Sequence, residues 1–247
     1  MPNWSENHIA IRGTKENVLA FVNEGLKNSG RKTYSDVNDI EKAVADLMEN
    51  GKALEYTTSL NKTDQNVTKG VMQERWNKGI WLGTFRPMPD IFKYDTTNNK
   101  DMFPEQAKEQ REKYGVVGWY NYNCNVRFST KWDADLQNFE YRELDGDAII
   151  SFSCQTAWYY PQAFLHWIKD TFNVAVFVMA IEESDEYAFY SEIDGEQYGQ
   201  PYSVEHPYDE ANAESNESYY DDWNNGEVEY YDEMFADFKE LVDNYKE

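Results

Sequence analysis

The sequence predicts an α+β protein in which helices cover an antiparallel β-sheet. An alternating apolar segment near the start of the chain is followed at once by a helical pattern, and the second half is rich in strand patterns. The 247 residues are 40% hydrophobic and 16% aromatic. A chain of this length and composition can form a sizeable core without disulfides or a structural metal.

The first two predicted elements are a strand and a helix. Residues 7–13 alternate between apolar and polar types and end at Gly13, a pattern typical of a half-buried strand. Thr14 is a good helix N-cap, and the residues after it place Val18, Leu19, Phe21 and Val22 at helical spacing. The chain therefore begins with a β-α unit.

Residues 30–114 interrupt this pattern and form a predicted insertion. Apolar residues recur at helical spacing between Val37 and Met48 and again from Val71 to Trp76, so we expect a mostly helical segment. Residues 83–89 contain one glycine and two prolines, which break regular structure. Pro104 is expected to start a further short helix that reaches Tyr114.

The second half contains a strong hairpin signal. Asp145-Gly146 separates two alternating runs, residues 138–143 and 148–153, and this dipeptide tolerates the positive φ angles of a type I′ turn. Pro161 is expected at the first position of a helix. A buried strand over 174–181 and its hairpin partner over 186–192 follow.

In order, the elements read β-α-insert-β-β-α-β-β, which is the ferredoxin-like order with one extra strand. The predicted domains are a ferredoxin-like domain formed by residues 1–29 and 115–200, a helical insertion at 30–114, and an acidic, aromatic-rich extension at 201–247.

Charge is distributed very unevenly. The chain holds 46 acidic and 23 basic residues, yet the first 140 residues have a net charge of only −1. Residues 182–247 contain 22 acids and two bases, Lys239 and Lys246. Such a run often only solvates a surface, but this one is rich in aromatic residues, which disordered acidic tails usually lack. We therefore expect much of it to fold.

Within the extension, residues 227–246 predict an amphipathic helix, because apolar residues from Val228 to Tyr245 recur every three or four positions. Its opposite face presents an acid about every 5 Å. The acidic residues expected to bind a partner are Glu229, Asp232, Glu233, Asp237, Glu240, Asp243, Asp221 and Asp222.

Such a row of carboxylates approaches the charge density of nucleic-acid phosphates and suits the basic groove of a DNA- or RNA-binding protein. The expected partner is a basic host protein, and the specific candidate is a nucleic-acid-binding defence protein. A pI near 4.4 argues against direct binding of nucleic acid by this chain. The alternative is that the acids only keep the protein in solution.

Most motifs of enzymes and metal sites are absent from the sequence. It has no glycine-rich phosphate loop, its three histidines and two cysteines lie far apart, and its Asp-Gly pairs are too short for a calcium loop. We expect no metal, no cofactor and no enzymatic activity. No apolar run approaches the roughly 20 residues of a membrane span, and the N-terminus lacks a signal-peptide pattern, so we expect a cytoplasmic protein without membrane contact.

A second candidate site is a small-ligand-binding or enzymatic site around a lysine, two tryptophans and two threonines. It consists of Thr130, Lys131, Trp132, Thr156 and Trp158. In this segment the lysine is followed in the sequence by an aromatic residue and a carboxylate, and its positive charge could bind an anionic ligand. In the simpler interpretation, the two tryptophans fill space between sheet and insertion.

Several short strings occur together in one order. They are Met1-Pro2-Asn3-Trp4 with Asn7 and Gly13, Arg86-Pro87-Met88-Pro89, Tyr114-Gly115 with Gly118-Trp119-Tyr120, Ser129-Thr130-Lys131-Trp132-Asp133-Ala134, and Thr156-Ala157-Trp158 with Pro161. In these the chain resembles the YubB-like family of plasmid and phage proteins over roughly residues 1–195. The resemblance implies a ferredoxin-like domain carried by mobile elements and no established activity.

The sequence departs from that family at several positions. Ser5 stands where a Cys is expected, Phe128-Ser129 where Trp-Gly is expected, and Tyr159-Tyr160 where a Ser-Pro-like pair is expected. The acidic extension lies outside the resemblance. The function predicted from the whole sequence is that of a non-enzymatic mobile-element accessory protein, which binds a host protein through its acidic surface as a nucleic-acid mimic that inhibits host defence.

Overall fold

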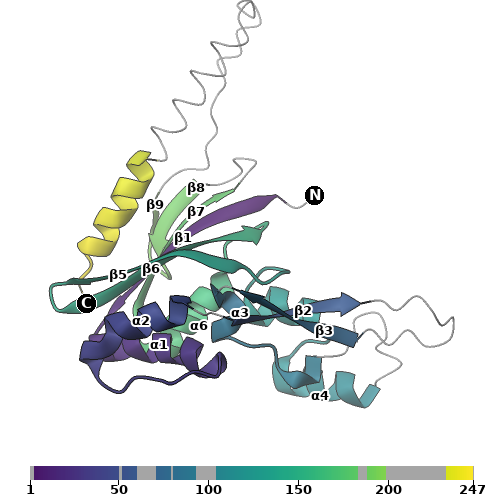
Figure 1. Ribbon diagram of the computed structural model, residues 1–247. Helices are drawn as coiled ribbons and strands as arrows, with labels where there is room; N and C mark the ends of the chain where they lie inside the picture. Colours follow the sequence, from purple (N-terminus) through teal and green to yellow (C-terminus); the bar gives the residue numbers. More distant parts are fainter. Residues whose placement is uncertain are drawn as a thin grey trace, which may run out of the picture.

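The structure is a computed structural model that describes residues 3–49, 52–59, 71–78, 80–92, 104–182, 188–198 and 232–246. Seven strands form one antiparallel sheet in the order β4-β5-β6-β1-β7-β8-β9 (Figure 1). Its strands are β1 (Trp4–Gly13), β4 (Ile80–Trp81), β5 (Asp135–Leu144), β6 (Asp147–Ala157), β7 (Ala175–Glu182), β8 (Ala188–Glu192) and β9 (Gln197–Tyr198). The predicted α+β class is confirmed.

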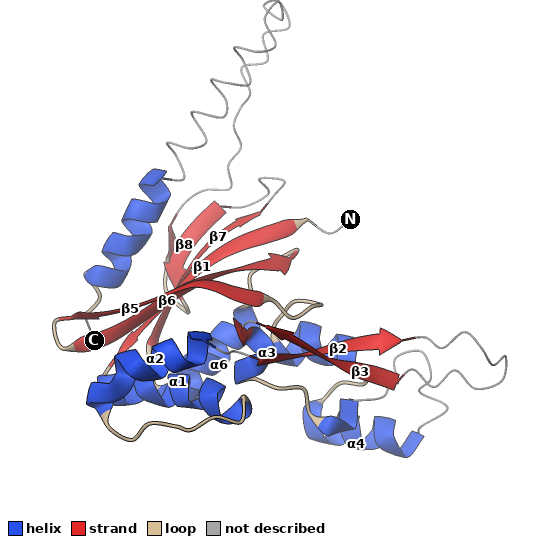
Figure 2. Cartoon of the chain, in the orientation of Figure 1, coloured by secondary structure: helices blue, strands red, loops and turns tan. Residues whose placement is uncertain are grey.

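Helices cover both faces of this sheet. One face carries α1 (Lys15–Asn28), α2 (Ile40–Glu49) and α6 (Gln162–Phe172), as Figure 2 shows. A helix over residues 232–243 lies on the other face. The remaining helices are η1 (Val37–Asp39), α3 (Leu82–Phe85), η2 (Asp90–Phe92), α4 (Pro104–Tyr114), α5 (Trp119–Tyr122) and the π-helical turn η3 (Asn123–Arg127). No helix among the described residues is both long and apolar enough to cross a membrane.

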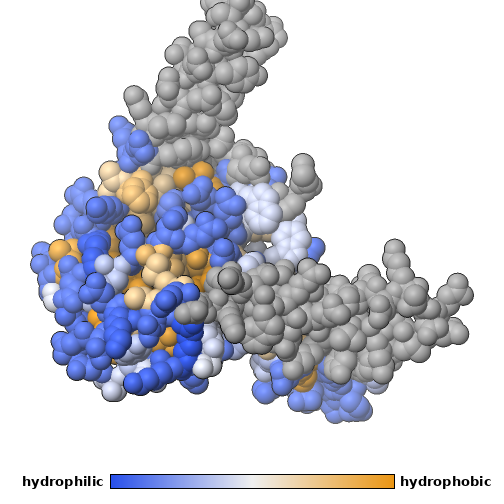
Figure 3. Space-filling view, in the orientation of Figure 1, coloured by the Kyte–Doolittle hydropathy of each residue, from blue (hydrophilic) through white to orange (hydrophobic). Residues whose placement is uncertain are grey.

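Strand β1 lies at the centre of the sheet and contributes to both layers. It pairs antiparallel with β6 on one side and β7 on the other. Because successive side chains of a strand point to opposite faces, Ile9 and Ile11 pack under α1 and α6, whereas Ala10 packs under the C-terminal helix. The surface over the helical layer is mainly hydrophilic, with smaller apolar areas (Figure 3).

Several local predictions are confirmed. Thr14 caps α1 and its Oγ1 accepts a hydrogen bond from the backbone N of Asn17 at 3.3 Å. Asp145 and Gly146 have φ angles of 54° and 95°, the positive values that a type I′ hairpin requires. Pro161 is the N-cap of α6 and not its first residue, a shift of one position.

The insertion differs from its prediction. Residues Val71 to Trp76, expected to be helical, lie in β3 (Val71–Lys78), which pairs with β2 (Lys52–Ser59) as a separate two-stranded sheet. Short apolar runs fit helical and strand periods about equally well. Here the pairing with β2 determines that the segment is a strand. The segment is thus mixed and not mostly helical: α2 and α4 are confirmed, while α3 forms one helical turn where a break was expected.

The insertion is joined to α1 by tight aromatic packing. Phe85 of α3 stacks on Phe21 of α1 with ring centroids 4.4 Å apart and nearly parallel planes, and both rings are fully buried. Gly25 of α1 makes this approach possible, because a Cβ there would lie 2.7 Å from Cε1 of Phe85 and 3.0 Å from Cδ1 of Leu47.

Replacing Gly25 with alanine tests this packing. Alanine normally stabilises a helix relative to glycine, but at this position overpacking against two buried side chains outweighs that gain. We expect Gly25→Ala to lower the free energy of unfolding by about 1–2 kcal/mol in urea denaturation. The matched control, Ala20→Gly at an exposed position of α1, reports the helix-propensity effect alone. Stabilisation by Gly25→Ala would contradict the packing.

Candidate functional site

The C-terminal helix is fixed to the sheet by its apolar face. Met234, Phe238 and Val242, spaced four residues apart, are each at most 5% exposed. They pack against a cluster on the sheet that includes Ala10 and Phe177. The amphipathic helix predicted at 227–246 is therefore confirmed over residues 232–243, and its first predicted residues lie outside the described part of the chain.

A buried arginine holds the end of this helix. Arg12 of β1 is 4% exposed, and its Nη1 donates to the backbone oxygens of Val242 and Asp243, both at 2.9 Å. Its Nε donates to Oδ2 of Asp147 at 2.8 Å. The last carbonyls of a helix have no intrahelical donor, so Arg12 supplies a cap from a strand more than 200 residues earlier in the chain.

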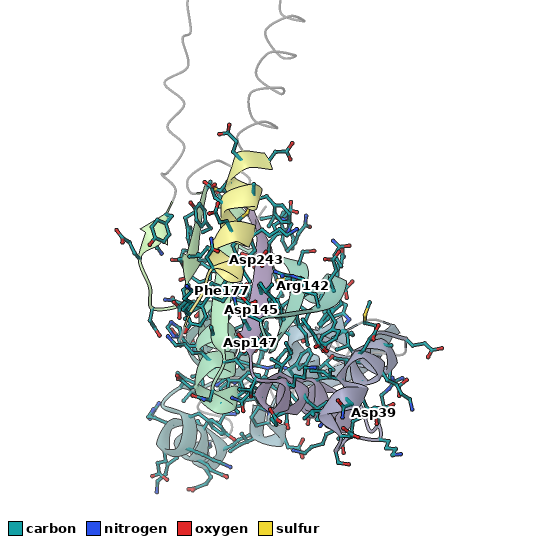
Figure 4. The ribbon with its side chains drawn as sticks, turned by 90° about the vertical axis from the view of Figure 1, so that its left-hand side faces the viewer. Asp39, Arg142, Asp145, Asp147, Phe177 and Asp243 are labelled. Atoms are coloured by element: carbon teal, nitrogen blue, oxygen red, sulfur yellow. The ribbon has the colours of Figure 1, made fainter. Side chains whose placement is uncertain are left out.

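A second arginine strengthens the same contact. Arg142 of β5 forms an ion pair with the carboxylate of Asp243. Figure 4 shows the two side chains close together at the end of the helix, with Asp147 nearby. Asp243, expected on the partner-binding face, therefore belongs to the contact that docks the helix on the sheet.

The opposite face of the helix presents the other described acids. Asp232, Glu233, Asp237 and Glu240 are exposed and span about 12 Å along the axis. Asp237 accepts a hydrogen bond from the hydroxyl of Tyr190 at 3.3 Å. Together these four residues form what we call the acidic face. The other expected members, Glu229, Asp221 and Asp222, lie outside the described residues.

The second candidate site also comes together, at the far end of β1. The rings of Trp132 and Trp158 stack with centroids 5.7 Å apart, and Trp4 lies 6.2 Å from Trp132. These three side chains, which we call the tryptophan platform, are 38%, 47% and 41% exposed. Lys131 places its Nζ 4.6 Å from the centre of the Trp132 ring. In the simpler interpretation these tryptophans fill space between sheet and insertion; the structure stacks them on each other and leaves part of each at the surface.

The two threonines of this candidate site have a different role. Thr130 and Thr156 are each 2% exposed. Their hydroxyls donate to the backbone oxygens of Ala157 at 3.2 Å and Tyr159 at 2.7 Å. They therefore hold the segment that carries Trp158 and do not face a ligand.

Trp158 has a strained backbone. Its φ is +66°, in the left-handed region that bulky residues rarely adopt. The backbone N of Trp158 donates to the carbonyl of Asn3 at 2.8 Å, and Asn7 donates to Oγ1 of Thr156 at 2.9 Å. The neighbouring structure thus holds Trp158 in a conformation that keeps its ring at the surface.

A buried polar network lies behind the platform. Arg86 Nη1 donates to the backbone oxygens of Val126 and Arg127, both at 2.8 Å, and burial lowers the pKa of Arg86. The carboxylate of Asp133 accepts from the backbone N of Gly83 at 2.9 Å. A Cβ on Gly83 would lie 2.1 Å from Asp133 Oδ2, so a larger residue there would have to displace this carboxylate. The network joins the insertion to η3 and to Asp133, the residue that follows Trp132.

A hollow of about 390 Å³ lies beside Trp4 and is lined by Trp4, Glu6, Gln155 and Ile181. Glu6 is 54% exposed, and its Oε1 lies 3.4 Å from Nε2 of His8. This hydrogen bond lowers the pKa of Glu6, so the carboxylate is ionised at neutral pH. The edge of the platform therefore carries a negative charge.

Neither cysteine is suited to thiol chemistry. Burial raises the pKa of Cys154 to about 12, and burial also raises the pKa of Cys124. A high thiol pKa leaves little of the reactive thiolate at neutral pH.

Sequence reasoning missed three important residues. Arg12 and Arg142 give the helix its docking contacts, and the signal for Arg12 was a single cation near the end of the half-buried strand pattern. Trp4 was noted within a motif string, but its proximity to Trp132 depends on the pairing of β1 with β6.

No protein-family model matches the sequence, and no curated protein does. Among solved structures, the chain is similar to the crystal structure of protein api92 from Yersinia pseudotuberculosis, which is assigned to the family model DUF1281. The TM-score is 0.34 and the sequence identity 11%, and the match covers 81% of this chain and 99% of that chain.

Replacing Arg12 with methionine tests the docking contact. The change removes three hydrogen bonds and leaves the Asp147 carboxylate and two helix carbonyls without this donor. We expect the free energy of unfolding to fall by about 3 kcal/mol, and amide hydrogen exchange within residues 232–243 to accelerate. Arg111→Met on the exposed side of α4 is the control. Unchanged exchange in the C-terminal helix would contradict the role of Arg12.

Alkylation tests the cysteine assignment. In the native protein at mildly alkaline pH, iodoacetamide should leave Cys154 unmodified, because the thiol is protonated and buried. In guanidinium chloride both cysteines should react completely, as mass spectrometry of the peptides would show. Rapid labelling of native Cys154 would mean that its thiol is accessible and ionised.

Proposed function

We propose that this chain is a non-enzymatic accessory protein of a phage or plasmid, with a ferredoxin-like core related to the YubB-like family. The order β5-β6-β1-β7, with α1 following β1 and α6 following β6 on one face, supports the ferredoxin-like assignment. The motif strings support the family relationship. In this proposal, the activity is the binding of a basic host protein.

The observation that carries the proposal is the acidic face of the C-terminal helix. Asp232, Glu233, Asp237 and Glu240 are exposed on a helix whose other side is buried and capped by Arg12. Flexible acidic tails lose conformational freedom when they bind, whereas these carboxylates already hold fixed relative positions. A fixed row of charges is suited to a partner with a matching row of basic groups.

The partner that fits this surface is a protein that binds nucleic acid. Its basic groove is shaped for regularly spaced phosphates, and an acidic helix that enters the groove excludes the natural ligand. A nucleic-acid-binding defence protein of the host is the specific candidate, since a mobile element benefits when such a protein is blocked. The net charge of −23 supports rapid association with a cationic surface.

The second candidate function is small-ligand binding or catalysis at Lys131, Trp132 and Trp158. The observation in its favour is that these residues meet at the surface. Ionic strength separates the two functions: binding through the acidic face weakens steeply as salt rises, whereas an apolar ligand at the tryptophans is affected little.

Neutralising the acidic face tests the proposed function. The variant Asp232→Asn, Glu233→Gln, Asp237→Asn and Glu240→Gln keeps the buried face of the helix intact. In affinity capture from host lysate at low salt, we expect this variant to lose the nucleic-acid-binding proteins that the wild type retains. High salt or excess duplex DNA should release those proteins from the wild type, because both compete with carboxylate contacts.

The control carries the same change in charge at another place. Glu49, Glu105, Glu109 and Glu112 are exposed on α2 and α4, and their replacement by glutamine should leave capture intact. Circular dichroism should show that both variants are folded. Equal capture by wild type and the acidic-face variant would refute binding through this surface, and equal loss in both variants would indicate non-specific attraction by net charge.

A further inference from the structure

The tryptophan platform is built from three segments that are far apart in the sequence. Trp4 begins β1, Trp132 lies just before β5, and Trp158 follows β6. These residues are 38–47% exposed although their rings contact one another. Exposed, contiguous aromatic surface is uncommon on a soluble protein and marks interaction sites. Tryptophan is also the residue most enriched among the dominant contacts of protein interfaces.

The backbone at Trp158 indicates that the exposure is imposed by the fold. A left-handed conformation at a bulky residue is strained, and strain of this kind concentrates at functional sites. The contacts from Asn3 and Thr156 that hold the segment leave the ring at the surface and 47% exposed. Interior packing therefore does not account for this residue.

The charges around the platform determine which ligands it can bind. Lys131 already lies 4.6 Å from the centre of the Trp132 ring and 5.8 Å from that of Tyr120, so an incoming cation must displace this lysine from Trp132 or stack on the exposed parts of Trp4 and Trp158. Glu6 lines the adjoining hollow beside Trp4. An aromatic surface with a carboxylate at its edge is complementary to a side chain that is planar or apolar along its length and positive at its end.

We infer that the tryptophan platform binds arginine side chains of the basic partner, with the guanidinium stacked on the indole rings and its charge directed toward Glu6. The inference rests on the proposed function, which requires a basic partner, and adds a second contact surface to it. The acidic face supplies long-range attraction, and the platform distinguishes arginine from lysine.

Arginine fits this surface better than the other cationic or planar groups. Its guanidinium is flat and weakly hydrated and stacks on aromatic rings, whereas the lysine ammonium is compact and strongly hydrated. Nucleic-acid bases also stack on aromatic residues, but a base brings a phosphate with it. Glu6 and the net charge of −23 oppose that phosphate more than the single charge of Lys131 attracts it.

Two short peptides of equal charge test the inference. The probes are acetyl-Gly-Arg-Gly-Arg-Gly-amide and its lysine analogue, titrated into the full-length protein with tryptophan fluorescence and calorimetry as readouts. Any non-specific attraction by the acidic extension acts on both peptides, so the ratio of their dissociation constants isolates the platform. We expect the arginine peptide to bind about threefold more tightly, because the planar, weakly hydrated guanidinium stacks on the rings better than the ammonium does.

Two platform variants and one control complete the experiment. Asparagine tolerates a positive φ, so Trp158→Asn removes the ring without adding backbone strain, and Trp132→Leu is the second variant. Both should reduce the arginine-to-lysine preference to about one. Tyr198→Leu, which removes an exposed ring on β9, should leave it unchanged. The acidic-face variant should weaken the binding of both peptides equally and keep the preference for arginine. A failure of the proposed function can therefore be distinguished from a failure of the platform inference.

Three results would overturn the inference. The first is an equal affinity of the wild type for both peptides, and the second is a preference that persists in a folded platform variant. The third is tight binding of a short oligothymidylate that Trp158→Asn abolishes, since that would make the platform a site for single-stranded nucleic acid.

Discussion

The burial of one guanidinium, that of Arg12, connects the beginning of the chain with its end. A charge placed inside a protein is costly unless its donors are satisfied, and Arg12 satisfies them with the Asp147 carboxylate and two carbonyls of the C-terminal helix. That helix in turn covers the apolar residues of the second sheet face, including Phe177. The acidic face keeps a fixed position because detaching its helix would expose that core and remove two of the hydrogen-bond acceptors of Arg12.

Strand β1 carries a different surface at each end. Arg12 lies near its last residue and Trp4 is its first, and eight residue steps of strand place them about 27 Å apart. Between them, β1 is paired on both sides, and Ile9, Ala10 and Ile11 are buried by the two helical layers. The tryptophan platform and the docking site of the acidic helix therefore sit on one rigid element, so a single partner can engage both only across a long and largely inflexible span.

The sequence predicted the sheet better than the insertion, and the reason is physical. Strands β6 and β7 and helix α1 carry strong local signals, since Thr14, Asp145-Gly146 and the apolar runs agree with the structure that formed. Residues 71–76 carry too few apolar positions to distinguish a strand from a helix, and pairing with β2 decided the outcome. The acids of the C-terminal helix could be predicted from periodicity alone, whereas Arg12, Arg142 and the grouping of Trp4 with Trp158 depend on contacts between distant segments.

The division of charge along the chain corresponds to a division of physical roles. Carboxylates act over about 10 Å at moderate salt, so a concentration of acid in one end of the chain attracts cationic proteins without discriminating among them. Stacking acts only at contact and depends on the shape of the cation. In the proposed function, the part of the chain that precedes the acid-rich residues 182–247 contributes selectivity because its sheet fixes Trp132 and Trp158 in place. A surface of carboxylates alone would bind cationic proteins strongly but without selectivity. The strained backbone of Trp158 is therefore most simply explained as the energetic cost of a surface that makes this binding selective.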